Sequence, residues 1–221
     1  MLAKELISDV VSALKTSDAG QTALNWMDVF RISHLPIVNN HDFLGLISDT
    51  DIYDLNDPDQ PIGNHKLSLI KPFVRMDQHI FDVISLAASM KLSLVPVLDD
   101  HDHYKGVVLT GELLQQLARM SSLTEPGGLI VLSILQNDYS LSQIAQIIES
   151  NDARILNLYI SSPPDSTRME VTIKLNITNL MPVIRTFERY EYEVMAWHSH
   201  DDDMDSFYSD RFDSFMRYLN I

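Results

Sequence analysis

The sequence predicts a mixed α/β and α+β fold, in which two similar units precede a third unit of different pattern. Two observations lead to this prediction: motifs that recur after about 60 residues, and a Pro-Gly-Gly sequence after which the pattern changes. At 221 residues, the chain is long enough to bury one large core or two small ones.

Two pairs of matching segments carry the internal repeat. HLPIV around Pro36 matches LVPVL around Pro96, 60 positions later, and GLISDTD from Gly45 matches GVVLTGE from Gly106, 61 positions later. Before each proline, apolar residues recur at spacings of three and four, which is typical of an amphipathic helix. Each unit is therefore predicted to be strand–helix–strand–strand–helix over about 60 residues.

The third unit begins after LTEPGG at 123–128, a predicted linker because Pro and paired Gly interrupt both helices and strands. The segment 129–200 predicts β-α-β-β-α-β, the split βαβ arrangement. Its third strand alternates apolar and polar side chains from Met169 to Leu175, so we expect one buried face. Residues 201–221 are predicted to form an acidic tail and a C-terminal helix.

The order of elements in residues 1–60 and 61–122 resembles a tandem pair of CBS (cystathionine-β-synthase-type) domains. The resemblance is carried by SHLPIV and SLVPVLDD, each followed by a glycine-led strand and a helix headed by an acid. The segment 129–200 resembles a ferredoxin-like ACT domain, and the combination is similar to acetoin-utilisation-type CBS–ACT regulatory proteins. This resemblance implies a regulatory homodimer with an adenine nucleotide as its ligand.

Ser48 and Asp51 stand three residues apart where a helix is predicted to begin. Taken alone, this spacing indicates a capping box, in which each residue satisfies the other's backbone N–H. The CBS resemblance implies instead that Asp51 accepts both ribose hydroxyls of an AMP-, ADP- or ATP-like nucleotide and that Ser48 contacts phosphate. The sequence leaves both interpretations open.

The same resemblance assigns the adenine slot to main-chain groups around His34, Leu35 and Pro36, and to Val11 and Ala13 of the opening strand. The alternative is structural: Pro36 stiffens the start of a strand, and His34 is a partly buried polar residue.

The second repeat departs from this pattern. Leu109 stands where the first repeat has Ser48 and offers no hydrogen bond, while Glu112 stands where the first repeat has Asp51. We therefore expect a second, weaker nucleotide site formed by Thr110 and Glu112.

In the ACT-like segment, Asn137, Asp138 and Tyr139 lie in the loop between the first predicted strand and helix. Helix N-terminal N–H groups there could bind a carboxylate, and Asp138 could bind the ammonium of an amino acid. The alternative is an Asx turn with a helix cap. The glycine typical of amino-acid-binding ACT loops is missing.

The composition excludes several partners. A net charge of −15 argues against nucleic acid, because phosphate backbones require clustered cations. No apolar run approaches the roughly 20 residues of a membrane span, and the N-terminus lacks the apolar region of a secretory signal. The absence of cysteine is consistent with a cytoplasmic protein.

No metal centre or catalytic centre is predicted. His198 and His200 would share one face of a strand, but no further ligand can be named, so we expect a solvated acidic tail. The nucleophile, zinc-protease and phosphate-loop motifs are absent, and cysteine is absent too.

The sequence thus predicts a regulatory ligand-binding protein that is not an enzyme and needs no metal. The alternative is a scaffold with degenerate pockets that docks a partner enzyme. A third interpretation is an amino-acid sensor that works through the ACT-like segment alone.

Overall fold

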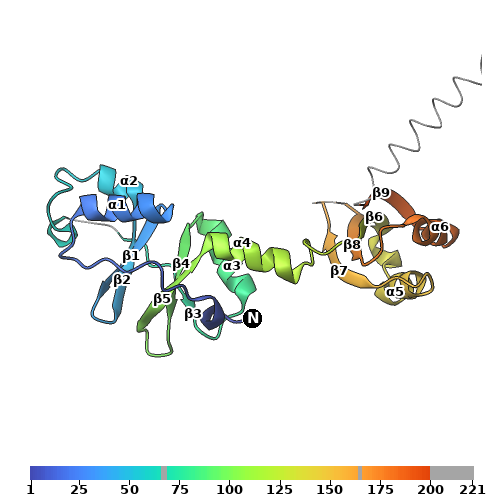
Figure 1. The fold of residues 1–221 in the computed structure, drawn as a ribbon, viewed down its shortest axis with the longest axis horizontal. Helices are drawn as coiled ribbons and strands as arrows, with labels where there is room; N and C mark the ends of the chain where they lie inside the picture. The colour runs from blue at the N-terminus through green and yellow to red at the C-terminus, as the bar shows by residue number, and fades with distance from the viewer. Residues whose placement is uncertain (66–68, 164–165, 200–221) are drawn as a thin grey trace, which may run out of the picture. The chain divides into compact units, whose positions relative to one another are not determined.

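The computed structural model describes residues 1–65, 69–163 and 166–199 (Figure 1). It divides into two compact units, Met1–Leu117 and Ala118–Ile221, and each has its own hydrophobic core. The predicted C-terminal tail and helix lie outside the described residues. No helix in the described part of the chain is long and apolar enough to cross a membrane.

The first unit contains both repeats, and one continuous core joins them. A two-stranded sheet belongs to the first repeat and a three-stranded sheet to the second. The elements in chain order are the 3-10 helix η1 (Ala3–Leu6), α1 (Gly20–Phe30), β1 (His34–Asn39), β2 (Asp42–Ser48), α2 (Asp49–Tyr53), the 3-10 helix η2 (Ile62–Asn64), β3 (Val74–Arg75), α3 (Ile80–Met90), β4 (Leu94–Leu98), β5 (Tyr104–Leu109) and α4 (Thr110–Met120), which continues past Leu117.

The helix before each proline ends in the same way in both repeats. Helix α1 is closed by Arg31 at φ 55° and α3 by Lys91 at φ 54°, and both N–H groups return to carbonyls of the last turn. Left-handed residues commonly close helices, although glycine usually takes this position. The two helices therefore end in the same way at equivalent positions of the sequence repeat.

The predicted opening strand of the first repeat is not formed. Leu14 makes only an isolated parallel bridge with Ile37, through bonds of 2.8 Å from Leu14 N to Pro36 O and from Val38 N to Leu14 O. Pro36 has no N–H, so the ladder cannot extend toward the start of β1. In the second repeat, the corresponding strand β3 is only two residues long.

In each repeat, the segment that precedes the first helix pairs with a strand of the other repeat. Ser8 bridges Val107 of β5, and Ile70 bridges Leu46 of β2. The glycines beside these bridges allow the close approach: a Cβ on Gly45 would lie 2.6 Å from Leu69 Cβ, and both Gly45 and Gly106 have φ near +150° (φ +151° and +146°). The glycine that opens GLISDTD and GVVLTGE is therefore required by packing.

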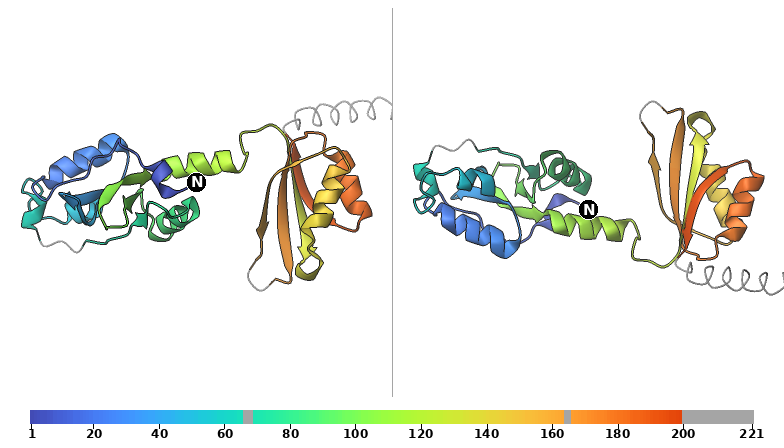
Figure 2. Two further views of the ribbon diagram at one scale, coloured as in Figure 1. Left: turned by 90° about the horizontal axis from the view of Figure 1, so that it is seen from below. Right: turned by 90° about the horizontal axis from the view of Figure 1, so that it is seen from above.

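The second unit is a four-stranded antiparallel sheet in the order β7-β8-β6-β9. Figure 2 shows both of its α-helices on one face of the sheet, where their apolar sides form the second core. The element order is the one predicted from the sequence. The elements are β6 (Gly128–Leu135), the 3-10 helix η3 (Gln136–Asp138), α5 (Leu141–Glu149), β7 (Ile155–Ser161), β8 (Arg168–Leu175), α6 (Met181–Arg189) and β9 (Glu193–Ser199).

The segment between α4 and β6 contacts the sheet of the second unit. Asn157 Nδ2 donates to Ser121 O at 3.3 Å, and Lys174 Nζ donates to Gly127 O at 3.3 Å. Gly128, the last residue of the predicted linker, is the first residue of β6. This segment is therefore held by side chains of β7 and β8.

Candidate functional site

Ser48 and Asp51 form a reciprocal cap at the start of α2. Ser48 Oγ accepts a hydrogen bond from Asp51 N at 3.1 Å, and Asp51 Oδ2 accepts from Ser48 N at 2.8 Å and from Ser48 Oγ at 2.6 Å. The two backbone bonds are those of a capping box, with Asp where Glu or Gln is more usual. The local role expected from the spacing is therefore present.

The cap occupies only one oxygen of the Asp51 carboxylate. Its bonds go to Oδ2, and Oδ1 accepts no hydrogen bond from the described residues. Asp51 is exposed, whereas Ser48 is half-buried. An ionised carboxylate has about four acceptor positions, so roughly two remain on Oδ1 for hydroxyls of a bound molecule.

His34 lies directly opposite Ser48 in the β1–β2 pair. Its half-buried imidazole places Nδ1 3.1 Å from Ser93 Oγ in the second repeat. Burial lowers the pKa of His34, while the carboxylates of Asp49 and Asp51 act in the opposite direction. The structure therefore places a neutral imidazole beside the capped helix start.

The remaining residues of the predicted adenine slot lie in or beside the core. Leu35 and Val11 are 0% and 4% exposed, Pro36 is buried, and Ala13 is half-buried. Pro36 O already accepts from Leu14 N. Ligand binding by these residues would depend on main-chain groups, and it stays a prediction.

At the second repeat, the hydroxyl of Thr110 is occupied, because it donates to Leu92 O at 2.7 Å. Glu112 lines a hollow of about 410 Å³ together with Glu5 and Asp9, and no Lys or Arg lines it. Three carboxylates without a cation disfavour a phosphate group. The hollow at Glu112 is therefore a poor site for an anionic ligand.

The second unit has a hollow of about 380 Å³ at the end of β6. Arg168 crosses one side of it, where Nε donates to Ser133 Oγ at 2.7 Å and the guanidinium pairs with Glu193. On another side, Tyr192 Oη donates to Gln143 Oε1 at 2.9 Å. Burial raises the pKa of the Tyr192 hydroxyl, so this group remains a donor at neutral pH.

Of the three residues predicted to bind a ligand in this unit, Asp138 lines the hollow. Asn137 is exposed and is not among the lining residues, and Tyr139 packs against the second core. Arg168 and Tyr192 also line the hollow but were not predicted from the sequence. Both lie far along the chain from Asp138, so no local sequence pattern connects them with it.

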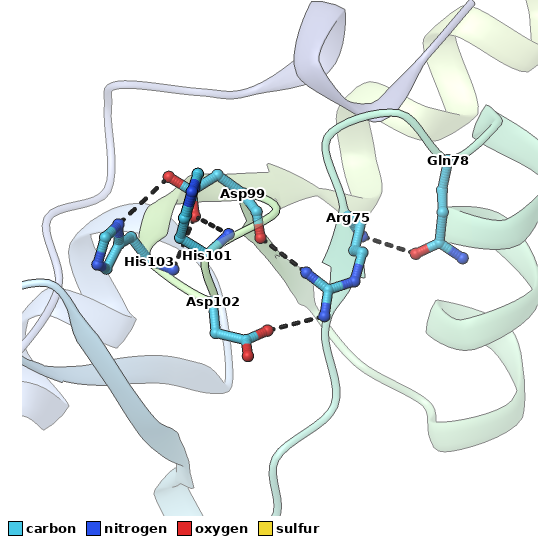
Figure 3. Close-up of polar contacts among 6 residues, drawn as sticks. All are labelled: Arg75, Gln78, Asp99, His101, Asp102 and His103. Carbon is cyan, nitrogen blue, oxygen red and sulfur yellow. Dashed lines mark hydrogen bonds and ion pairs between the residues drawn. The ribbon is translucent and has the colours of Figure 1, made fainter.

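The turn between β4 and β5 holds a group of charged side chains that bond to one another and to the backbone (Figure 3). Asp99 Oδ1 accepts from the N–H groups of His101 and His103, each at 2.9 Å. Arg75 Nη1 donates to Asp99 O, and Arg75 Nη2 pairs with Asp102 at 2.8 Å. Among the described residues, no group of three His, Cys, Asp or Glu side chains is arranged to hold a metal ion.

Comparison with known families identifies the segment that contains the Ser48–Asp51 cap. Residues 3–56 match the CBS domain family. The chain is also 22% identical over 148 residues to inosine-5'-monophosphate dehydrogenase from Methanocaldococcus jannaschii. That match covers 66% of this chain and 29% of the relative, so the chain spans less than a third of that enzyme.

Three solved structures are similar to this chain. A CBS domain pair/ACT domain protein from Thermotoga maritima is 23% identical, with 54% of this chain and 98% of that chain covered and a TM-score of 0.48. The CBS domains of a transcriptional regulator from Streptococcus pneumoniae are 19% identical, with 52% and 98% covered and a TM-score of 0.46. CBSX2 in complex with AMP is 17% identical, with 53% and 96% covered and a TM-score of 0.44.

Proposed function

We propose that the first unit is a CBS pair that binds an adenine nucleotide at the start of α2, and that the protein is regulatory. Asp51 Oδ1 accepts the ribose hydroxyls, and Ser48 lies on the phosphate side. Binding shifts the protein between packing states to the extent that the nucleotide prefers one of them. The proposal includes no catalytic step and no metal.

One observation carries this proposal. Within the CBS-matching segment, the helix cap holds Asp51 in place while leaving Oδ1 free. The second repeat has no hydroxyl at Leu109, and Glu112 shares its hollow with two further carboxylates. The first repeat is therefore the better candidate for a ligand that carries a diol and a phosphate.

A thermal-shift panel of AMP, ADP, ATP, S-adenosylmethionine and NAD tests the proposal. A ligand at about one hundred times its Kd should stabilise the folded state by about 2.7 kcal/mol. Asp51→Asn should remove the shift, because asparagine keeps an acceptor for Ser48 N but loses the charge and one acceptor oxygen.

Glu112→Gln is the matched control, since it changes the equivalent acid in the second repeat. It should keep the shift. The proposal fails if none of the five compounds stabilises the wild type, or if Asp51→Asn responds as the wild type does.

A scaffold function is the second candidate, and the cap itself favours it. Ser48 and Asp51 satisfy each other without a ligand, as expected of a pocket kept for structure alone. In that case no nucleotide shifts the melting temperature, and the acidic surface docks a partner enzyme.

We also propose that the second unit is an ACT module whose hollow at Asp138 receives a small molecule such as an amino acid. Its strand order supports this assignment, as do the carboxylate of Asp138 and the guanidinium of Arg168 on one cavity. A melting shift with free amino acids that survives Asp51→Asn and disappears in Asp138→Asn would assign sensing to this unit. The regulatory function that we propose also includes the association of two copies of the chain into a homodimer.

A further inference from the structure

One face of the sheet in the second unit has no helix over it among the described residues. Figure 2 shows α5 and α6 together on the other face, where Ile130 and Leu132 of β6 are fully buried. Successive residues of a strand point to opposite faces of the sheet, so Leu129, Val131 and Ser133 belong to the uncovered face. All three are half-buried. This face is therefore available to a further layer of structure.

An uncharged row of side chains crosses this face. Val131 lies opposite Thr172 of β8 and Ala196 of β9. Thr172 in turn lies opposite Tyr159 of β7. Residues that lie opposite each other in antiparallel strands share a face, so these four side chains are neighbours. Tyr159 is 55% exposed, and Leu135, at the end of β6 on the same face, is 42% exposed.

The segment that precedes β6 covers only one end of this face. Asn157 and Lys174 each donate to a main-chain carbonyl of the segment 121–127 at 3.3 Å. Both side chains lie in the row of Leu129, the row next to that of Val131. Among the described residues, no hydrogen bond joins the segment 121–127 to the row of Val131. The uncharged row therefore stays open.

Charged residues limit the uncharged area along the flanking strands. Lys174 and His198 lie opposite Leu129 at one end, and Glu170 and Glu193 lie opposite Ser133 at the other. The uncharged area is thus narrow and follows the central strand β6. Such a shape suits a single amphipathic helix better than the sheet of a second copy, which would also bring the charged residues into contact with their own copies.

The chain that follows β9 has a pattern suited to this face. Strand β9 ends at Ser199, which is paired with Gly128 at the start of β6. Residues 201–221 lie outside the described residues. Their sequence has apolar side chains at spacings of three and four, typical of one side of a helix. These are Tyr208, Phe212, Phe215, Met216 and Leu219.

The length of this segment also matches the central strand. A helix from Tyr208 to Leu219 would rise about 17 Å at about 1.5 Å per residue. The strand from Leu129 to Leu135 spans about 20 Å at about 3.4 Å per residue. Residues 200–207 can extend about 25 Å, which is ample for a turn from β9 to β6, about 4.8 Å away.

We propose that residues 201–221 fold back over the uncovered face and lay the apolar side of a helix along β6. The helix runs antiparallel to β9, so that Phe212 lies over Val131. The acids Asp201, Asp202 and Asp203 come to lie at the end of the face that holds Lys174. Within the described residues the ammonium of Lys174 makes no ion pair, so these carboxylates complement it.

A segment of the same chain is a better occupant than a free partner, because a short tether gives an effective concentration of about a millimolar. The inference concerns the second unit alone. It depends neither on a nucleotide nor on an amino acid, so each of those proposals can fail without affecting it.

The absence of cysteine allows a direct test in the full chain. A chain that carries Val131→Cys and Phe212→Cys should form a disulfide within one chain under oxidation, seen by mass spectrometry and non-reducing electrophoresis. The matched control combines Phe212→Cys with Gln146→Cys, an exposed position on α5 at the other face of the sheet. It should form no disulfide within the chain.

Three outcomes of this test would overturn the proposal. A disulfide between two chains would mean that a second copy covers the face. No disulfide would mean that the segment does not reach Val131. Equal yields for the two cysteine pairs would mean that the segment samples both faces without docking on either.

Thiol labelling measures the cover without a cross-link. In a chain with Val131→Cys as its only cysteine, Phe215→Asp should raise the labelling rate at least tenfold, because a carboxylate on the apolar side disfavours docking. Ser214→Asp adds the same charge to the polar side and should leave the rate unchanged. Circular dichroism checks that both variants are folded. Equal labelling rates for the two variants would overturn the proposal.

Discussion

The imidazole of His34 and the hydroxyl of Ser93 lie 3.1 Å apart and connect the first repeat to the second. Ser93 Oγ also accepts a hydrogen bond from Ser33 N at 3.0 Å. Since Ser33 and Ser93 are equivalent positions, this polar contact lies where the repeats meet. It places a titratable side chain between the two halves of the first unit.

The His34 contact predicts a pH dependence of stability. Burial holds the pKa of His34 below its ordinary value of 6.5, so the unfolded chain binds this proton more readily. The free energy of unfolding should therefore fall as the pH decreases from about 7.5 to 5.5, and His34 should contribute no dependence above that range. Urea denaturation at several pH values measures it.

His34→Asn is the matched variant, because its amide can still bond to Ser93 but does not titrate. It should show a shallower loss of stability toward low pH than the wild type. Equal slopes for the two proteins would assign the pH dependence to other histidines.

Gly45→Ala should destabilise the first unit by about 1–3 kcal/mol. The added Cβ would lie 2.6 Å from Leu69 Cβ and 2.8 Å from Ile70 O, at a φ of +151° that L-residues avoid. Gly111→Ala is the control, since a Cβ there meets nothing within 4 Å and alanine favours the helix by about 0.5–1 kcal/mol. Chemical denaturation of both variants should give shifts of opposite sign, and equal shifts would refute the packing explanation.

Ser48→Ala should lower the free energy of unfolding by about 1 kcal/mol, because α2 loses its N-cap acceptor. Asp51→Asn should cost less, since an amide oxygen can still accept from Ser48 N. Denaturation curves without ligand measure both effects. A larger loss for Asp51→Asn than for Ser48→Ala would show that the carboxylate, rather than the cap, maintains this turn.

We expect Asp99 to make the free energy of unfolding depend on pH in the acidic range. Its hydrogen bond with Lys105, at 2.8 Å, and the N–H groups of His103 and His101 hold the pKa of the Asp99 carboxyl well below its ordinary value of 3.8. The stability from this carboxylate is therefore present above about pH 4 and is lost as the pH falls below it. Acid titration followed by circular dichroism should show a weaker acid dependence for Asp99→Asn, and an unchanged profile would contradict the prediction.

The sequence predicted those parts of the fold that depend on neighbouring residues. Apolar spacing predicted α1 and α3, alternation predicted β8, and the separation of Ser48 from Asp51 predicted the cap. Each of these patterns is a local rule of backbone geometry. The prediction of the opening strand was wrong because a parallel ladder depends on its partner, and the partner strand β1 carries Pro36, which has no N–H to extend the ladder.

The sequence by itself determined the repeat, the order of elements in the second unit and the capped start of α2, since hydrogen bonds and side-chain periodicity within a few residues dictate them. Only the tertiary structure decided that the leading segment of each repeat pairs with the other repeat and that Arg168 shares a cavity with Asp138. These features join residues far apart in the chain, and the distance between them in space depends on packing that no local pattern encodes.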